Sequence, residues 1–525
     1  MIEHFPFYLA LIIVIVLLIM LANKLKVAYP VVLVLAGLSF SFIPGMPVVH
    51  IKPELIFIIF LPPLLYEAAV AISWKELWRW RRIITSFAFI VVFLTASTVA
   101  VVADMFIPGL SLALGFLLGG IVSPPDAVSA GAILKFVEVP RRVSSILEGE
   151  SLLNDASSLI IFRFALVAVG TGQFIFWNAA LNFGWMVLGG VGIGLIIGWL
   201  FMKAHRLLPT DVNMDIILSL AAPYVMYIAA EEAHSSGILS VVSGGLLLSN
   251  KRNEYLTSSS RLRGDNVWQS LVFVLNGLVF ILIGLDLPEI KEGLNKEGVS
   301  LLSAIGYGLL ITAVLIAVRF VASYGALIVT MIARNFIQVA DPNPGYKAPI
   351  LLGWAGMRGV VSLAAALSIP VQLSDGTPFP HRNLILFITF VVIISTLLLQ
   401  GLTLPILIRN IKLPGFNDYL PDEEATNVIK KGLAQATVTH IKSNYPQEIE
   451  RDIHLQQIAN KWRQVDDGAF DGVVKAQSKS IHLDILAHQR KWLLDRNKSD
   501  DKIDEEVIRK FLHLIDLEEE KIKAT

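Results

Sequence analysis

Hydrophobic residues form long, nearly uninterrupted runs over the first 410 positions of this chain, and polar residues dominate only afterwards. Several runs approach 20 residues, the length that an α-helix needs to cross a hydrocarbon layer about 30 Å thick. A soluble fold could bury one such run but not a dozen, so the pattern predicts an all-α polytopic membrane protein. We expect thirteen membrane spans, over residues 7–23, 28–43, 54–73, 83–103, 110–134, 144–169, 179–202, 212–230, 236–249, 268–285, 301–333, 348–370 and 383–408.

Residues 411–525 are as polar as an ordinary soluble protein. Segments such as NVIKKGLAQATVTHIK and EEVIRKFLHLIDLEEEKIK place apolar residues at helical spacing, with charges on the opposite face. We therefore expect a transmembrane transporter domain over 1–410 and a small, helical, cytosolic tail over 411–525. Two interpretations of the tail stay open: a solubilising or partner-binding appendage, or a regulator of the first domain.

Composition agrees with a membrane protein and excludes several other classes. The chain is 55% hydrophobic and 16% charged, whereas a soluble domain carries about 25% charged residues. The net charge is zero, which gives no support for a nucleic-acid partner. The absence of cysteine excludes disulfides, thiolate metal sites and a cysteine nucleophile. No enzyme motif and no cofactor motif is evident.

The distribution of Lys and Arg predicts the orientation. Nineteen of these residues fall in loops after odd-numbered spans, and four fall in loops after even-numbered spans. Because positively charged loops stay on the cytoplasmic side, we expect a multi-pass protein of the cell membrane with its N-terminus outside and its C-terminus in the cytoplasm.

Ionisable side chains inside the expected spans are candidates for function, because a charge at mid-bilayer costs about 2.5–3.5 kcal/mol or more. Seven such residues lie well inside the spans: Glu67, Asp126, Glu150, Asp155, Arg163, Arg319 and Arg358. The first local pattern is Ser123-Pro124-Pro125-Asp126. Adjacent prolines remove backbone donors, so this span should be broken where it lines a polar cavity, with free carbonyl groups beside Asp126.

The second pattern is the segment ESLLND, residues 150–155. Ser151 and Asp155 are four residues apart and share a helix face, as do Glu150 and Asn154. These two polar stripes should face the protein interior. Ligands that are all oxygen suit a hard cation such as Na⁺, and a purely structural polar network is the alternative.

The third pattern is Gly356-Met357-Arg358-Gly359, where glycines flank a charge. If span 179–202 joins two inverted repeats, this second weak point corresponds to the break before Asp126. A matched pair of interrupted spans is the best sequence indication of a transporter site. Arg358 would then face exposed helix-end carbonyls; an arginine that reaches the interface or a neighbouring helix is the alternative.

Three charges remain. Pro62 and Pro63 predict another broken span just before Glu67. Arg319 has no acidic neighbour in its own span and needs one from elsewhere. Arg163 should extend toward the interface, with its charged end in water.

The segments FLPPLLYEAA, SPPDAVSA, EGESLLNDASSLI and GWAGMRGVVSLAAAL, in this order and with Arg319 between the last two, resemble the sodium/proton exchanger family. The resemblance covers residues 50–410 and is greatest to the electroneutral branch, which contains bacterial and archaeal NhaP-type antiporters and animal NHE exchangers. Many relatives have proline directly after the aspartate of the first broken span, whereas Ala127 follows Asp126 here.

The resemblance implies that Asp155 is the principal carrier of the cation and the proton, with Asp126, Ser151 and Glu67 as further ligands. It also implies that Glu150 pairs with Arg319, and that the two unwound spans cross within a moving core. Spans 1–3 and 8–10 would form a homodimer interface in the lipid bilayer.

These patterns lead to one expected function, the electroneutral exchange of Na⁺ or Li⁺ for H⁺. Related electrogenic antiporters carry Asp where this chain has Asn154, and an amide holds no exchangeable proton near neutral pH. A K⁺/H⁺ antiporter and a cation-coupled solute symporter remain as alternatives.

Overall fold

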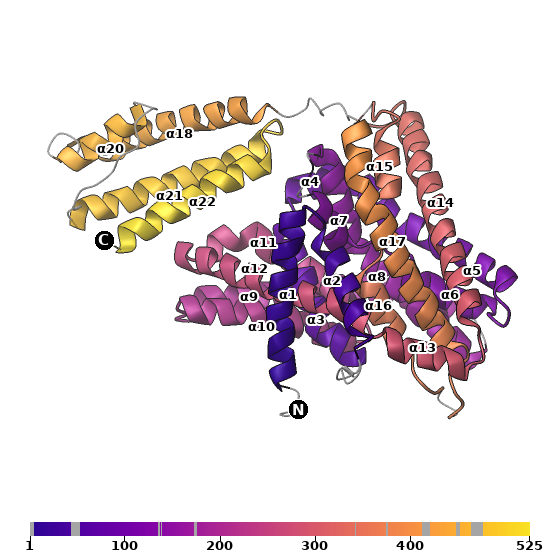
Figure 1. Cartoon of the computed structure of the whole chain (residues 1–525). Coiled ribbons are helices and arrows are strands. Elements are labelled where there is room, and N and C mark those ends of the chain that lie inside the picture. The colour runs from indigo at the N-terminus through magenta and orange to yellow at the C-terminus, as the bar shows by residue number, and fades with distance from the viewer. Residues whose placement is uncertain are drawn as a thin grey trace. The chain divides into compact units, whose positions relative to one another are not determined.

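A computed structural model describes residues 5–43, 53–134, 137, 139–172, 176–341, 343–373, 376–411, 420–447, 452–463 and 476–524. Within these residues every regular element is a helix, apart from an isolated bridge between Gln372 and Pro378 (Figure 1). The chain forms two compact units. The first contains residues 1–208, 217–252 and 268–414, and the second contains residues 209–216, 253–267 and 415–525.

Most of the helices up to residue 411 begin and end close to the expected spans. The helical stretch that contains span 83–103 begins already at Trp74, however, the helix that contains span 268–285 begins at Ser258, and a further helix, Leu287–Lys296, occupies an expected loop. They are α1 (Phe5–Leu25), α2 (Tyr29–Phe40), α3 (Pro53–Ala71), α4 (Trp74–Thr85), the π-helix η2 (Ser86–Val91), α5 (Val92–Phe106), α6 (Leu112–Val122), α7 (Ala127–Leu134), α8 (Arg141–Thr171), α9 (Phe176–Leu207), α10 (Val212–Glu232), α11 (Gly237–Tyr255), α12 (Ser258–Leu285), α13 (Leu287–Lys296), α14 (Leu301–Ala333), α15 (Ala348–Trp354), α16 (Val360–Leu367) and α17 (Arg382–Ile411).

Seven helical stretches among the described residues are long and apolar enough to cross a membrane: Trp74–Phe106, Arg141–Thr171, Leu181–Leu207, Val212–Glu232, Ser258–Asn295, Leu301–Ala333 and Arg382–Ile411. Shorter apolar helices lie at Leu9–Leu25, Tyr29–Phe40, Phe57–Ala71 and Leu112–Val122. The protein is therefore an all-helical, multi-pass membrane protein.

Two of the three predicted breaks are confirmed. The first separates α6 from α7 at residues 123–126, and the second separates α15 from α16 at residues 355–359. The third prediction, a break at Pro62 and Pro63, is wrong, because α3 continues through both prolines. Pro63 cannot donate to the carbonyl of Ile59, four residues earlier. The hydroxyl of Tyr224 in α10 donates to that carbonyl at 3.3 Å, so the acceptor is satisfied without unwinding α3.

Small residues allow several helices in the first unit to pack closely. In α9, Gly190, Gly194 and Gly198 recur every fourth residue. Gly190 lies against Ser236, just before α11, and the other two lie against α11 itself. A Cβ atom at Gly190 would overlap that serine, and one at Gly194 would overlap backbone and side-chain atoms of α11. Such stripes of small residues are a common basis for helix association in membranes. They indicate that α9 and α11 form one rigid pair.

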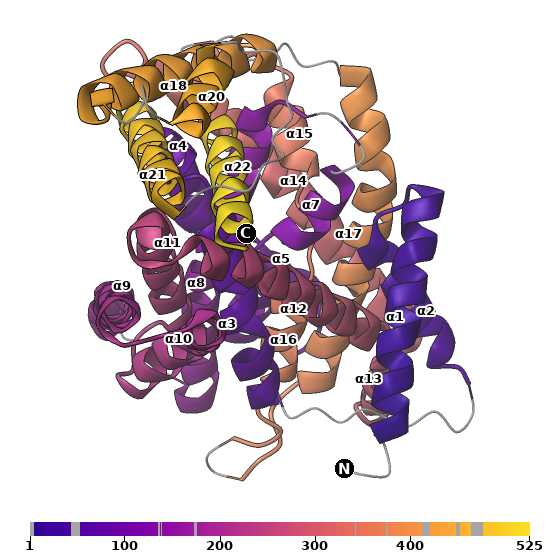
Figure 2. The ribbon, with the colours of Figure 1, turned by 90° about the vertical axis from the view of Figure 1, so that its left-hand side faces the viewer.

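The second unit contains the helices of the tail: α18 (Asp422–Asn444), α20 (Ile453–Arg463), α21 (Ala476–Ser499) and α22 (Glu505–Ala524). Figure 2 shows α21 and α22 side by side. Buried apolar residues from α18, α21 and α22, including Ile429, Leu493 and Ile508, form its core. The helical spacing in the sequence predicts these elements, although it gives no indication of their partners.

Residues at the start of α12 also belong to this second unit. Arg261 is buried and forms an ion pair with Asp516 of α22. Arg490 of α21 lies 2.9 Å from Asp516 and 2.6 Å from Glu519. Arg261 also donates to the carbonyl oxygen of Leu256 at 2.6 Å. The first turn of α12 is thus part of the core of the tail.

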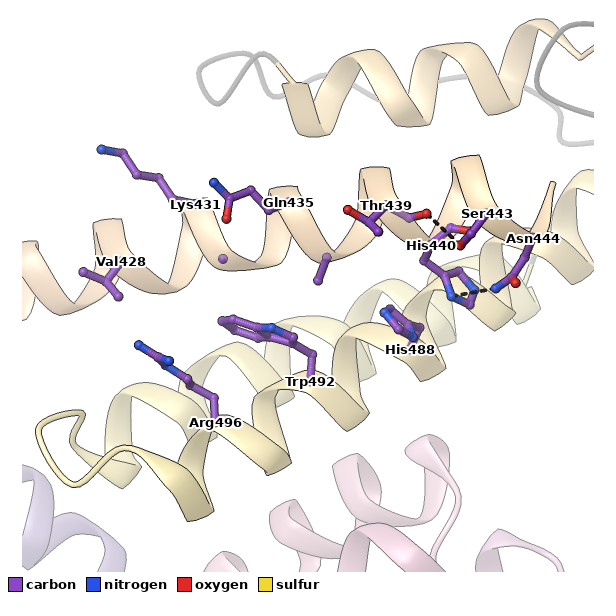
Figure 3. Close-up of a pocket in the computed structure, with 12 residues that line it drawn as sticks. Val428, Lys431, Gln435, Thr439, His440, Ser443, Asn444, His488, Trp492 and Arg496 are labelled. Carbon is purple, nitrogen blue, oxygen red and sulfur yellow. Dashed lines mark hydrogen bonds between the residues drawn. The ribbon is translucent and has the colours of Figure 1, made fainter. Parts of the chain in front are cut away.

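A cavity of about 940 Å³ lies between α18 and α21 (Figure 3). The ring of Trp492 lies against Gly432, where a side chain on α18 would overlap it. Toward the other end, the rings of His440 and His488 stack with centroids 4.0 Å apart. Asp484 accepts a hydrogen bond from Tyr445 at 2.5 Å and lies 2.8 Å from His440. Polar contacts therefore connect α18 and α21 at this end of the cavity.

Candidate functional site

The two helix breaks are hydrogen-bonded to each other. The backbone N–H of Asp126 donates to the carbonyl oxygen of Met357 at 2.8 Å. In return, Nε of Arg358 donates to the carbonyl oxygen of Val122 at 2.5 Å. Val122 is the last residue of α6, so its carbonyl has no partner further along the helix. The chain thus brings both unwound segments to one place.

Asp126 lies at this junction. Its Oδ1 accepts from the backbone N–H of Val128 at 3.0 Å, and its Oδ2 accepts from the hydroxyl of Ser129 at 2.6 Å. The carboxylate therefore caps the start of α7, where an acidic group is favoured by the helix dipole. Its Oδ2 also lies directly against Gly359, where any Cβ atom would overlap it.

Arg358 is buried and compensates the helix-end carbonyls, as the sequence predicts. Besides its bond to Val122, its Nη1 donates to the carbonyl oxygen of Gly356 at 2.5 Å. Its backbone N–H donates to the hydroxyl of Thr396 in α17 at 3.1 Å. Thr396 was not identified from the sequence, because nothing in its local pattern distinguishes it from other threonines in an apolar helix.

Helix α8 places three polar residues beside the first break. Nδ2 of Asn154 donates to the carbonyl oxygen of Pro125 at 3.1 Å, and the hydroxyl of Ser151 approaches the same oxygen at 3.4 Å. Asn154 is fully buried and Asp155 is 7% exposed. The carboxylates of Asp155 and Asp126 are close enough to interact electrostatically. Four of the expected site residues therefore gather around Pro125.

Glu150 and Arg319 form a buried ion pair between α8 and α14. Nη1 of Arg319 donates to Oε1 of Glu150, and Nη2 donates to Oε2 at 2.6 Å. Nε of Arg319 donates to the carbonyl oxygen of Leu352 in α15 at 3.2 Å. This bidentate geometry is the strong form of an arginine–carboxylate contact. It ties α14 and α15 to the helix that carries Asp155.

Glu67 occupies a different position from the other expected ligands. It lies on the unbroken helix α3 and is half-buried. Glu67 and Asp126 both lie close enough to the phenol of Tyr29 in α2 to interact with it electrostatically. No three His, Asp or Glu side chains in the described ranges form a cluster that fits a bound metal ion.

Some buried oxygens at the junction have no hydrogen-bond partner among the residues that the structure describes. They are the side-chain oxygens of Ser123, Asn154 and Ser362. Ser123 belongs to the first break, Asn154 to α8 and Ser362 to the first turn of α16. A buried polar atom of this kind is available to bind a water molecule or an ion. Oxygen donors beside two carboxylates are the chemistry that a small monovalent cation requires.

Arg163 has a partner that the sequence does not identify. Its Nη2 lies 2.5 Å from Oε2 of Glu231, at the end of α10. Oε1 of Glu231 accepts from the backbone N–H of Gly237 at 3.2 Å. The partner is 68 residues away along the chain, and the sequence places it in a loop, so no local signal identifies the pair.

Comparisons with known proteins identify the family to which the chain belongs. The family profile described as "Sodium/hydrogen exchanger, transmembrane" matches residues 10–410. A "Sodium, potassium, lithium and rubidium/H(+) antiporter" of Bacillus subtilis is 35% identical over 388 residues, which cover 72% of this chain and 57% of that protein. The "Na(+)/H(+) antiporter ApNhaP" of Aphanothece halophytica is 33% identical, over 74% of this chain and 71% of that protein.

The match thus spans less than three fifths of the length of the Bacillus relative. Among solved structures, the sodium proton antiporter MjNhaP1 from Methanocaldococcus jannaschii has the same fold, with a TM-score of 0.61 and 18% identity. That match covers 78% of this chain and 99% of the other. The family is one of transporters and not of enzymes. By its match over residues 10–410, the chain belongs to the transmembrane sodium/hydrogen exchanger family.

Proposed function

We propose that this protein exchanges a monovalent cation for protons across the membrane, and that Asp155 carries both in turn. The observation that carries the proposal is the meeting of the two helix breaks beside Asp155. Broken helices at a shared junction supply backbone carbonyls and helix ends for an ion. The names of the relatives from Bacillus and Aphanothece, both antiporters, support the same function.

Competition for one site couples the two ions. A carboxylate in a low-dielectric interior needs a compensating charge, because an uncompensated buried charge costs several kcal/mol. Asp155 satisfies this condition when it holds either a cation or a proton. Without a bound ion, the negatively charged site can move between the two sides of the membrane only at a large energetic cost. Asp126 remains hydrogen-bonded to Ser129 and Val128 and acts as a second ligand, with Ser151 and Glu67 in supporting positions.

We propose that the exchange is electroneutral and that Na⁺ or Li⁺ is the cation. Asn154 donates a hydrogen bond to Pro125, which an ionised carboxylate at that position could not do. Asp155 is then the one titrating group of the ESLLND segment beside Pro125, since Glu150 is held by Arg319. The Bacillus relative is named for potassium and rubidium as well as sodium, so K⁺ is the main alternative cation.

The finer architecture belongs to the same proposal. We infer thirteen spans arranged as inverted repeats, with the two breaks at equivalent positions. The loop charges support an outer N-terminus and a cytoplasmic C-terminus, with a transporter domain over 1–410 and a cytosolic tail over 411–525. A homodimer formed through spans 1–3 and 8–10 completes the proposal.

Proteoliposomes containing a trapped pH dye test this function. Addition of Na⁺ or Li⁺ outside should drive protons out of the vesicles, and the Asp155→Asn protein should give no signal. A larger response to K⁺ would favour the K⁺/H⁺ alternative. Proton movement that requires an organic solute would instead establish a symporter. No cation-dependent proton movement by the wild-type protein would refute the proposal.

A further inference from the structure

Most helices of the first unit can be placed in two groups, which also contact each other, for example where α3 packs on α8 and α16. We call α1–α3 and α9–α12 the flank group. Within it, Ile15 of α1 packs on Gly277 of α12, Tyr224 of α10 bonds to α3, and Ser249 of α11 donates to the carbonyl oxygen of Val70 in α3 at 2.8 Å. Helix α9 belongs to the same group, because its glycine stripe packs against α11.

We call α4–α8 and α14–α17, together with η2, the core group. It contains both breaks, Asp126, Asp155 and the buried pair Glu150–Arg319. At one end of α8, Arg142 forms an ion pair with Asp341, just after α14. At the other side of the site, α5 and α6 pack backbone to backbone, because Gly119 leaves no room for a side chain against Ala96. The ion site therefore lies on a closely tied set of helices.

Arg163 and Glu231 connect these two groups. Arg163 is on α8, eight residues after Asp155, which places it about 12 Å further along the helix. It lies toward the end of α8 opposite Arg142. Glu231 is on the last turn of α10 and also accepts from the first backbone N–H of α11. One carboxylate thus joins the helix of the ion site to the α10–α11 turn of the flank group.

We propose that the Arg163–Glu231 ion pair is a latch between the two groups, closed in this conformation and opened in each transport cycle. This inference rests on the proposed function, since alternating access moves one helix bundle against another around a fixed site. Arg163 and Glu231 are positioning residues: they set which conformation is favoured and do not contact the ion.

The exposure of the two side chains supports a contact that breaks easily. The side chains of Arg163 and Glu231 are 41% and 30% exposed, whereas those of Arg319 and Glu150 are 4% and 1% exposed. A buried ion pair that loses one partner leaves an uncompensated charge, so Glu150–Arg319 remains closed. A partly exposed pair can open where water reaches both charges, and its net contribution to stability is then small.

A reversible cross-link tests whether the latch must open. The chain has no cysteine, so an Arg163→Cys/Glu231→Cys protein offers only two thiols to a bifunctional methanethiosulfonate reagent. Cross-linked protein in liposomes should lose cation-driven proton exchange, and a reductant should restore it. A matched control is Trp185→Cys/Ala233→Cys, since the indole of Trp185 donates to the carbonyl of Ala233 within the flank group. Cross-linking that control should leave the rate unchanged.

Exchange by the cross-linked Arg163→Cys/Glu231→Cys protein at the rate of its reduced form would overturn the latch. A second measurement does not depend on transport. Spin labels at Val167→Cys on α8 and Ile228→Cys on α10, both exposed positions, report the separation of the two groups.

Arg163→Ala should raise the population of a second distance by about two- to fivefold, the range that a partly exposed ion pair supports. The combined change Arg163→Glu/Glu231→Arg should return the distribution toward that of the wild type. An unchanged distance distribution in Arg163→Ala would also refute the latch. Failure of the proposed function can be distinguished from failure of the latch, because the wild-type protein would then show no cation-dependent proton movement.

Discussion

The side-chain amide of Asn154 donates a hydrogen bond to the carbonyl oxygen of Pro125, 3.1 Å away, and thereby joins α8 to the broken span before Asp126. An aspartate at this position would lose the donor and place a charge beside the carbonyl oxygen. A buried acceptor left unpaired costs about 1–3 kcal/mol. We therefore expect Asn154→Asp to lower the thermal stability of the purified protein.

The same substitution tests the proton stoichiometry. With Asn154 present, exchange should be insensitive to a membrane potential clamped by K⁺ and valinomycin. Asn154→Asp adds a titrating group, so any remaining exchange should depend on potential, where one charge corresponds to about 2.3 kcal/mol per 100 mV. A steep dependence already present in the wild-type protein would contradict the electroneutral mechanism and direct attention to Glu67.

The two aspartates should differ in their effects on transport. Asp155→Asn removes the proposed carrier, so exchange should fall to the level of empty liposomes while the protein remains folded. Asp126→Asn keeps one oxygen to accept from Val128 or Ser129 but loses the charge, so exchange should weaken, with a higher apparent KM for the cation. Initial rates over a range of Na⁺ concentrations check both. Near wild-type exchange by Asp155→Asn would rule out its role as carrier.

Glu150 and Arg319 should be coupled in stability and not in ion binding. Because each side chain is buried and paired with the other, Glu150→Gln or Arg319→Met should cost about 3–5 kcal/mol. Replacing both by apolar residues should recover part of the loss. A double-mutant cycle of thermal unfolding measures this coupling, and effects that simply add would show that the pair contributes no interaction energy.

Gly359 should tolerate no side chain. A Cβ atom there would overlap Oδ2 of Asp126, so Gly359→Ala must displace the carboxylate. Overpacking of this kind costs about 1–3 kcal/mol, and we expect a clear loss of exchange. Gly131→Ala in α7 is the matched control, because no atom lies within 4 Å of a Cβ built there. Equal exchange by the two variants would show that Asp126 does not need its present position.

The tail should lose stability in mildly acidic solution. Burial, and then the neighbouring His440, hold the pKa of His488 below its ordinary value of 6.5, while Asp484 acts in the opposite direction. The unfolded chain therefore takes up this proton at a higher pH than the folded tail does. The stabilising contribution is complete above about pH 6.5 and is lost as the pH falls through the folded pKa.

A dye attached at Lys498→Cys in the full-length protein follows this transition in urea at pH 7.5 and pH 5.5. The urea midpoint should be lower at pH 5.5, and His488→Gln should reduce the difference between the two conditions. An equal pH effect in the wild type and in His488→Gln would exclude His488 as its source.

The sequence predicts the parts of the site whose signal is local. Adjacent prolines before Asp126 and glycines around Arg358 both mark real breaks, because backbone donors and helix propensity are properties of neighbouring residues. The same reasoning is wrong at Pro62 and Pro63, where α3 stays helical and the hydroxyl of Tyr224 in another helix donates to the carbonyl left free by Pro63. A proline removes a hydrogen bond, but tertiary partners decide whether the helix opens.

Ion pairs and hydrogen bonds between residues far apart in the sequence leave no local pattern, so the sequence alone does not predict them. Arg163 has no acidic residue within four positions along the chain, and Glu231 lies outside the expected spans. Thr396 supports Arg358 only because α17 passes the second break. For Arg319, the resemblance to a known family supplied the partner that the local pattern could not.

The ion pair between Arg261 and Asp516 has a consequence for any shortened form of this protein. A chain ending near residue 411 would keep the first turn of α12 and lose the carboxylate that neutralises its buried guanidinium. Removing the tail is therefore not equivalent to detaching an accessory. It leaves a positive charge without its carboxylate at the start of a membrane helix. Altered transport by such a truncation would therefore reflect this charge as well as any lost signal from the tail.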